Sequence, residues 1–385
     1  MDHGTALRTG AQPSARKKTV RDPRLDVFRG IGMLIILVAH IPDNRWALFI
    51  PARFGFSDAT EMFVFLSGMA SAIAFGRLFD REGTLAMTGR VAQRAWQIYW
   101  AHVCVFVAIA TLSALAGLRP DGSQSYVQYL NLTRFFADPG PQLIGLMTLT
   151  YVPNYFDILP MYMVILILMP VMLAAERAWR GLPFLLMALL WSSAQVPIVH
   201  FPAEPWSDRH WFFDPFGWQL LFFLGFFLMR GTLPAPRYRP EFMALALTIV
   251  LLTIPFAWHV ALQANPFLAE SARAIAPLTD KTSFGLLRLV HFLALAYVAF
   301  HLVGEKGHRL TNPALAPVIA LLSKVGQQSL AVFVTGMVLA RMLGIALDHL
   351  GRDSLTTALA NLAGFAILVA TAYGVAWFKS PPWKS

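Results

Sequence analysis

Residues 24–40 read RLDVFRGIGMLIILVAH, an apolar stretch with a basic residue near its start and a histidine at its end. Arg29 and His40 are eleven positions apart, about three helical turns or ~16 Å, so both side chains lie on nearly the same stripe of a helix. Polar groups within hydrocarbon are costly and usually mark function. The stretch therefore predicts a membrane helix whose polar side chains take part in the function of the protein.

The rest of the chain has the composition of a membrane protein. Hydrophobic residues make up 57% of the 385 residues and charged residues only 14%. Apolar runs near the ~20 residues that cross a bilayer recur along the chain. We therefore expect an all-α polytopic membrane protein with about ten transmembrane helices. The predicted spans are Gly30–Phe49, Ala59–Phe79, Trp96–Leu118, Ile158–Ala175, Leu182–Val199, Phe216–Met229, Phe242–Leu262, Phe284–Val303, Gly326–Leu347 and Leu355–Trp377.

The distribution of charge predicts the orientation. With the N-terminus inside, the cytoplasmic segments hold 21 of the 31 Lys and Arg residues but only 8 of the 21 acidic ones. The positive-inside rule then places both termini in the cytoplasm. The net charge of +10 is explained by this topology, so we expect no nucleic-acid partner.

Three regions follow from this topology. Residues 1–23 are basic and rich in Gly, Ser and Pro, which predicts a disordered cytoplasmic tail. Residues 24–379 form the integral-membrane domain, and residues 380–385 a short cytoplasmic tail. The chain has a single cysteine, Cys104, so we expect neither a disulfide nor a thiol metal site. We expect no metal and no resident cofactor.

Several polar side chains share one depth in the predicted bundle. Counted along their spans, they lie in the half that faces away from the cytoplasm, on five different helices: His40, Asp58, Glu61, Asp157, Arg288, His291 and Arg341. Equal depth does not establish that they meet laterally. An alternative is that some pair privately, for example Glu61 with Arg341, as buried charges in membranes commonly do.

A second basic set lies at the predicted cytoplasmic mouth. Arg29 opens the first span, and Arg90 and Arg94 precede the third span one turn apart. Paired guanidinium groups bind phosphate oxygens in fixed geometry, so these three are candidates for phosphate binding. The alternative is that they serve topology alone. His102, two turns into the third span, is a candidate for lining a path between the two mouths.

These residues resemble known family patterns. The spacing of Arg29 and His40, the FVFLSG run at 63–68 and the arginines before the third span resemble the acyltransferase-three clan of ten-helix membrane acyltransferases. In that clan two arginines after the second span often have two residues between them, whereas Arg90 and Arg94 have three, as do Arg77 and Arg81. More narrowly, RLDVFRG at 24–30, DATEMFVFLSG at 58–68 and DILPMY at 157–162 resemble the OpgC-type proteins, which are associated with succinylation of osmoregulated periplasmic glucans.

The resemblance implies an O-acyltransferase of the bacterial inner membrane that uses acyl-CoA as a co-substrate. It implies transfer of an acyl group, most plausibly succinyl, to a hydroxyl of a periplasmic glucan or other glycan. His40 would act as general base or as a transient acyl carrier, and Asp58 or Glu61 would orient its imidazole. Arg288 or Arg341 would hold a distal carboxylate. The remaining substrate-binding candidates are Arg29, Arg90, Arg94, His102, Asp157, Tyr162 and His291.

A transporter or flippase for an anionic solute is the alternative from a different class, because it too places charges at mid-membrane between two polar mouths. The sequence shows no matched interruptions of hydrophobic segments in two halves, which favours the enzyme. The lipid bilayer is an expected partner in either case, and a homo-oligomer is compatible with both.

Overall fold

The computed structural model describes residues 23–196 and 199–380. Every regular element in these ranges is helical, and extended pairing is limited to two isolated bridges, Leu118 with Ser125 and Pro202 with His210. The all-α class expected from the sequence is confirmed. The predicted tails, 1–23 and 380–385, lie almost wholly outside the described residues.

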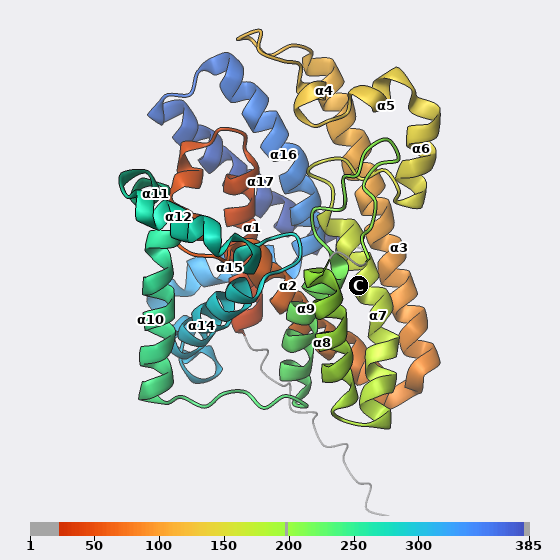
Figure 1. Ribbon diagram of the computed structural model, residues 1–385, viewed down its shortest axis with the longest axis vertical. Helices are drawn as coiled ribbons and strands as arrows, with labels where there is room; N and C mark the ends of the chain where they lie inside the picture. The colour runs from red at the N-terminus through yellow and green to blue at the C-terminus, as the bar shows by residue number, and fades with distance from the viewer. Residues whose placement is uncertain (1–22, 197–198, 381–385) are drawn as a thin grey trace, which may run out of the picture.

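The main helices pack side by side into one bundle (Figure 1). In chain order they are α1 (Pro23–His40), α2 (Ala59–Ser71), α3 (Arg77–Ala116), α7 (Ile158–Ala178), α8 (Leu182–Gln195), α9 (Pro215–Arg230), α10 (Pro240–Ala257), α14 (Leu286–Leu302), α16 (Ser329–Leu350) and α17 (Ser354–Lys379).

Shorter helices form the connections. They are η1 (Arg45–Leu48), η2 (Pro51–Arg53), the π-helical turn η3 (Ala72–Gly76), α4 (Tyr126–Tyr129), α5 (Thr133–Ala137), α6 (Pro139–Thr148), α11 (His259–Ala264), α12 (Pro266–Ala274), α13 (Ala276–Thr279), η4 (Glu305–Thr311), η5 (Pro313–Leu315) and α15 (Ala316–Gln327). In Figure 1 the lower end of the bundle carries the ends of α7 and α9 and the start of α10, and the upper end carries α4 and α5.

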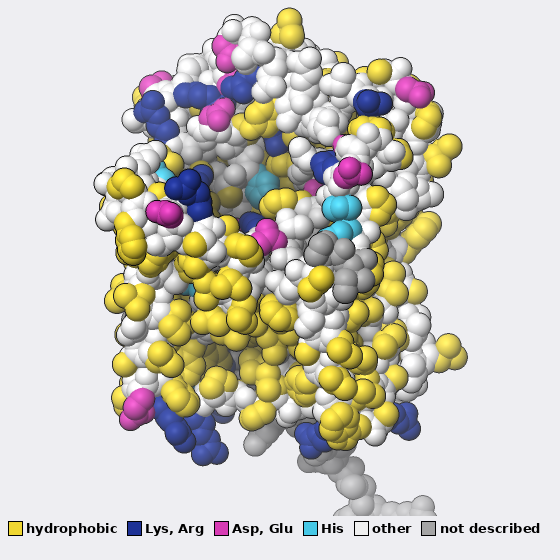
Figure 2. Space-filling model, in the orientation of Figure 1, with side chains coloured by type: hydrophobic (Ala, Val, Ile, Leu, Met, Phe, Trp, Pro, Cys, Tyr) yellow, Lys and Arg dark blue, Asp and Glu magenta, His cyan; other side chains and the backbone are white. Residues whose placement is uncertain are grey.

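Several helices have the length and apolar composition of membrane spans. Five such segments occur among the described residues: Ala59–Ala116, Ile158–Ala178, Pro240–Ala257, Ser329–Leu350 and Ser354–Lys379. Shorter apolar helices are α8, α9 and α14. Figure 2 shows a band of hydrophobic side chains on the lower half of one face, with Lys and Arg below it and mixed charges above. These features support a membrane protein, whereas ten crossings and cytoplasmic termini stay predictions.

The segment Ala59–Ala116 joins the predicted second and third spans through an interruption at Gly83. Its 58 residues would extend ~87 Å as one helix, far more than a bilayer. Gly83 has φ 83° and ψ −173°, a conformation that side chains disfavour and glycine adopts readily. The chain therefore changes direction at Gly83, at the lower end of the bundle.

Close helix crossings hold the centre of the bundle together. A Cβ added to Gly68 of α2 would lie 1.9 Å from the carbonyl oxygen of Phe222, and one added to Gly225 of α9 would lie 2.3 Å from that of Phe65. The backbones of the two helices are thus in direct contact, an arrangement that small residues such as glycine allow in membrane helix bundles. The crossing places the start of α2 against the segment that precedes α14, where the charged residues gather.

We predict that Gly68→Ala lowers the melting temperature of the purified protein. The new methyl group meets backbone atoms rather than a flexible side chain, so α2 and α9 must separate at a cost of about 1–3 kcal/mol. Gly89→Ala is the matched control, since nothing lies within 4 Å of the added Cβ and alanine is the better helix former. Equal melting temperatures for Gly68→Ala and the wild type would contradict the close crossing.

Candidate functional site

His40 is the last residue of α1 and its ring is held by its own helix. The ring Nδ1 lies 2.7 Å from the carbonyl oxygen of Ile36. A carbonyl can only accept, so we assign the proton of the neutral ring to Nδ1. Nε2, which has no protein hydrogen-bond partner among the described residues, then carries the lone pair and is available as a base.

Tyr155 packs against His40 from the loop before α7. The two rings make an edge contact with centroids 5.2 Å apart, and the Tyr155 hydroxyl donates to the carbonyl oxygen of Met337, 2.9 Å away. Tyr155 has φ 89°, a region that non-glycine residues avoid and that is found most often at functional sites. The fold thus accepts a strained backbone to place this ring beside His40.

Arg341 of α16 lies over the same tyrosine. Its guanidinium carbon is 4.1 Å from the centre of the Tyr155 ring and 5.2 Å from that of Tyr129. Its Nε is buried without a hydrogen-bond partner, and no carboxylate within the described residues forms an ion pair with it. Arg341 is therefore a cation beside His40 that no acidic side chain neutralises.

Asp348 lines a small cavity with Arg341 but is already engaged. It accepts from the Tyr126 hydroxyl at 2.9 Å, from Arg352 at 2.6 Å and from Arg119 at 3.3 Å. Burial and the bond to Asp348 raise the pKa of Tyr126 to about 12, which keeps this donor protonated. Asp348 is thus occupied by three donors, and Arg341 stays available to an anionic ligand.

Asp58 and Glu61 begin α2 and form a reciprocal cap. The Asp58 side chain accepts from the backbone N–H of Thr60 at 2.6 Å, and the Glu61 side chain accepts from the backbone N–H of Asp58 at 2.7 Å. Each carboxylate also has a cationic partner: Lys281 Nζ lies 2.5 Å from Asp58, and Arg288 Nε lies 2.7 Å from Glu61. Lys281 lies in the segment that leads into α14, and Arg288 lies in the first turn of α14.

These pairs correct one expected role. Asp58 or Glu61 was expected to orient the imidazole of His40, but the hydrogen bonds of both carboxylates go elsewhere and the carbonyl of Ile36 fills that role. The physical reason is the capping of α2. The carboxylate oxygens accept hydrogen bonds from backbone N–H groups at the start of that helix. The private pair that forms is Glu61 with Arg288, not Glu61 with Arg341.

His291 lies one turn beyond Arg288 and faces the loop before α2. Its Nδ1 is 2.7 Å from the Ser57 hydroxyl. The ring is buried against Gly55, where an added Cβ would come within 2.3 Å of Nε2. His291 thus fixes the approach of the 55–58 loop to α14.

The upper half of the molecule is hollowed on one face. Figure 2 shows a hollow in one face, with histidine and Lys or Arg side chains visible in its depth. The charged groups that act on His40 are Lys281, Arg341 and Asp58. The structure brings His40, Asp58, Glu61, Arg288, His291 and Arg341 into one region, which their equal depth alone did not establish.

Three other candidates contact residues outside this set. Asp157 precedes α7 and accepts from the backbone N–H of Phe212 at 2.8 Å, so it ties two loops together. Tyr162 packs on Phe222 with ring centroids 5.8 Å apart. His102 is buried within α3, and its Nε2 has no hydrogen-bond partner in the described part of the chain.

The arginines expected to bind phosphate at the cytoplasmic side lie on different helices. Arg29 belongs to α1, which packs against α2, α15 and α16, whereas α3 packs against α7 and α16. On α3, Arg90 and Arg94 bond to the side chains of Gln93 and Gln97 on the same helix, at 2.5 and 3.1 Å.

A comparison with protein-family models shows which family the chain belongs to. The model for the OpgC protein matches residues 21–380. The chain belongs to the OpgC family. Neither the curated proteins nor the solved structures include a match to it. Membership in the OpgC family supports a transferase with an OpgC-type role in glucan modification.

Two residues of this OpgC-family site escaped the sequence analysis. Lys281 was passed over because it stands in a short polar run between apolar segments, where lysines are usually solvated. Tyr155 was not among the candidates, since its positive φ is invisible in the sequence. The signal that favoured Lys281 was the pair of carboxylates at Asp58 and Glu61, which needed cations.

We predict that Asp157→Asn stabilises the protein near neutral pH. Burial raises the pKa of the Asp157 carboxyl to about 6, from an ordinary 3.8, so the folded state holds this proton more tightly than the unfolded state. Stability therefore falls as pH rises from about 4 to about 6, by up to about 3 kcal/mol. Asparagine keeps an acceptor for Phe212 without the charge.

Melting temperatures measured from pH 4 to pH 8 test this expectation. The gain of Asp157→Asn over wild type is expected above pH 6 and should shrink towards pH 4. Asp157→Ala, which lacks the acceptor, serves as the comparison and should destabilise at every pH. A pH-independent difference for Asp157→Asn would contradict the raised pKa.

Proposed function

We propose that this OpgC-family protein is a membrane O-acyltransferase in which His40 acts as general base on an acceptor hydroxyl. The observation that carries the proposal is the hydrogen bond from His40 Nδ1 to the Ile36 carbonyl. It leaves Nε2 as the basic atom, in a ring that packs on Tyr155 beside Arg341, which no acidic side chain neutralises. A base fixed in one tautomer is what proton abstraction requires.

The proposed reaction conserves atoms and charge. His40 Nε2 takes the proton of a sugar hydroxyl while the hydroxyl oxygen attacks the carbonyl carbon of an acyl-CoA thioester. An ester bond forms, the C–S bond breaks, and the imidazolium returns the proton to the departing thiolate. Transient acylation of Nε2 is the second route, and it uses the same free atom.

The donor and acceptor are proposed to approach from opposite ends. Acyl-CoA is cytoplasmic, and the lower end of the molecule carries the clustered Lys and Arg side chains (Figure 2). Arg29, Arg90 and Arg94 remain our candidates for its phosphates, and His102 for the path inward. The glucan would enter the hollow from the periplasm, with the protein in the bacterial inner membrane.

Succinyl is the acyl group that Arg341 favours. A succinyl donor carries a free carboxylate to His40, where an unpaired charge would be costly. Of the two arginines considered, Arg288 is occupied by Glu61 and by the Thr279 carbonyl. Arg341 lacks a carboxylate partner, so it is the proposed contact for the succinyl carboxylate.

The proposal is tested by incubating the purified protein in detergent with radiolabelled succinyl-CoA and periplasmic glucan. Covalent label on the glucan is expected, with a mass increase of about 100 Da per succinyl group. A transporter or flippase would transfer no label in the absence of a membrane, and that outcome would overturn the proposal.

We predict that His40→Ala abolishes labelling while the protein stays folded, because the side chain supplies the base and little packing. Labelling should fall by at least about 100-fold, in line with the usual contribution of a general base. The control is His349→Ala, which removes an exposed histidine from the upper end of α16. Wild-type labelling by His40→Ala at an unchanged melting temperature would exclude both roles of His40.

We further predict that Arg341→Gln reduces succinyl transfer far more than acetyl transfer. Loss of a buried charge-assisted contact is worth roughly 2–5 kcal/mol, enough to change the succinyl-to-acetyl ratio more than tenfold. Competition between the two labelled donors measures this ratio. The matched control is Arg273→Gln, an exposed arginine of α12. An unchanged ratio in Arg341→Gln would show that Arg341 does not bind the carboxylate.

A further inference from the structure

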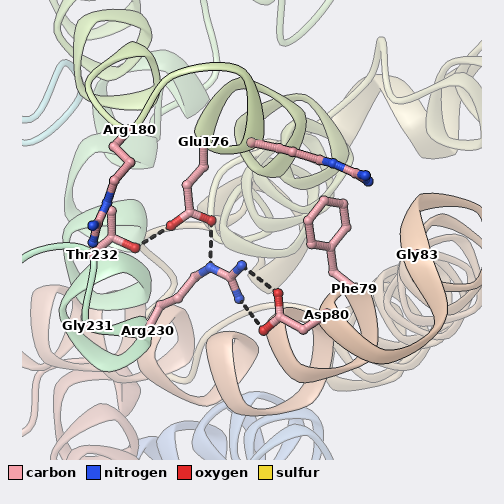
Figure 3. A pocket seen from close by; sticks show the side chains of 9 residues that line it. Phe79, Asp80, Gly83, Glu176, Arg180, Arg230, Gly231 and Thr232 are labelled. Atoms are coloured by element: carbon pink, nitrogen blue, oxygen red, sulfur yellow. Dashed lines mark hydrogen bonds and ion pairs between the residues drawn. The ribbon is translucent and has the colours of Figure 1, made fainter.

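A large cavity opens at the lower end of the molecule, far along α7 and α9 from the His40 region. Its volume is about 680 Å³, within the range of small-molecule sites. Figure 3 shows it between the start of α3, the end of α7 and the end of α9. Its lining consists of Phe79, Asp80, Gly83, Glu176, Arg177, Arg180, Arg230, Gly231 and Thr232.

One wall of this cavity is a closed ion-pair network. Arg230 donates to both oxygens of Asp80, at 2.8 and 3.0 Å, and its Nε donates to Glu176 at 2.6 Å. The Thr232 hydroxyl donates to the other oxygen of Glu176 (Figure 3). Both carboxylates of the lining are thus already occupied, so neither is left to neutralise another cation.

The other two basic side chains of the lining form no ion pair within the described residues. Arg177 lies in the last turn of α7 and Arg180 in the turn that leads to α8. Both are exposed, and no hydrogen bond or ion pair joins either guanidinium to another described residue. Two like charges that border one cavity repel each other unless an anion lies between them.

The backbone of Gly83 also lines this cavity. Its left-handed conformation ends one helical stretch of α3, and residues 84–116 continue as another. Beginnings of helices carry N–H groups that lack helical acceptors and favour anions. No atom lies within 4 Å of a Cβ added at Gly83, so the space in front of this backbone is open.

We propose that this cavity binds a phosphate group, with Arg177 and Arg180 as its main contacts. Guanidinium groups match phosphate oxygens in pairs. The phosphate can come from the nucleotide end of coenzyme A or from the headgroup of an anionic phospholipid. Trp179, between the two arginines and 63% exposed, is the kind of side chain found at membrane interfaces. The coenzyme A source rests on the proposed function, whereas the lipid source does not.

The test measures binding rather than catalysis, so it does not depend on acyl transfer. In one arm, coenzyme A is titrated onto the full-length protein in nanodiscs of phosphatidylcholine, which carries no net charge. In the other arm, retention of phosphatidylglycerol by the detergent-purified protein is measured by native mass spectrometry. Both arms compare wild type with Arg177→Ala plus Arg180→Ala, and with Arg177→Lys plus Arg180→Lys.

Weakening of at least about tenfold in either arm supports the site and identifies the source. Lysine should recover part of the affinity, because it keeps the charge but not the paired geometry. The matched control is Arg81→Ala plus Arg237→Ala, which removes two exposed arginines that do not line the cavity. The proposal is overturned if neither ligand is affected, or if the control variant loses as much binding as the cavity variant.

Discussion

The upper half of the structure depends on the two carboxylates that begin α2. Asp58 and Glu61 cap the helix and at the same time bind Lys281 and Arg288 from a segment more than 200 positions away. A buried pair of this kind adds little net stability, but removal of one partner leaves a charge without compensation. The pairs therefore fix where the 279–288 segment lies relative to the start of α2.

The same constraint divides the arginines into two kinds. Arg288 and Arg230 are held between carboxylates and serve the fold, since their charge is already neutralised. Arg341 and Arg177 lack such partners among the described residues, and they border the two spaces that a ligand can enter. The two proposed binding regions, near opposite ends of the molecule, thus each contain an arginine without a carboxylate partner among the described residues.

Much of this arrangement could be predicted from the sequence, because apolar length and residue type carry it. The all-helical class follows from the repeated apolar runs, and the shared depth of His40, Glu61 and Arg288 follows from their positions along the spans. Which buried charges form ion pairs with each other could not be predicted. Whether Glu61 pairs with Arg288 or with Arg341 depends on lateral packing, which is decided by crossings such as that of Gly68 on Phe222. The backbone of Tyr155 and the corner at Gly83 likewise depend on tertiary contacts that residue spacing does not encode.

The hydrogen bond from His40 to Ile36 has a genetic consequence. In many enzymes the group that orients a catalytic histidine is an acidic side chain, and its codon is a separate target for loss-of-function mutation. Here the acceptor is a main-chain carbonyl of the same helix, which every amino acid supplies. Substitutions at position 36 that preserve the helix would leave the imidazole orientation intact. If His40 is the base, as proposed, inactivating alleles near this histidine would fall on codon 40 itself, or on proline and glycine changes that break the last turn of α1.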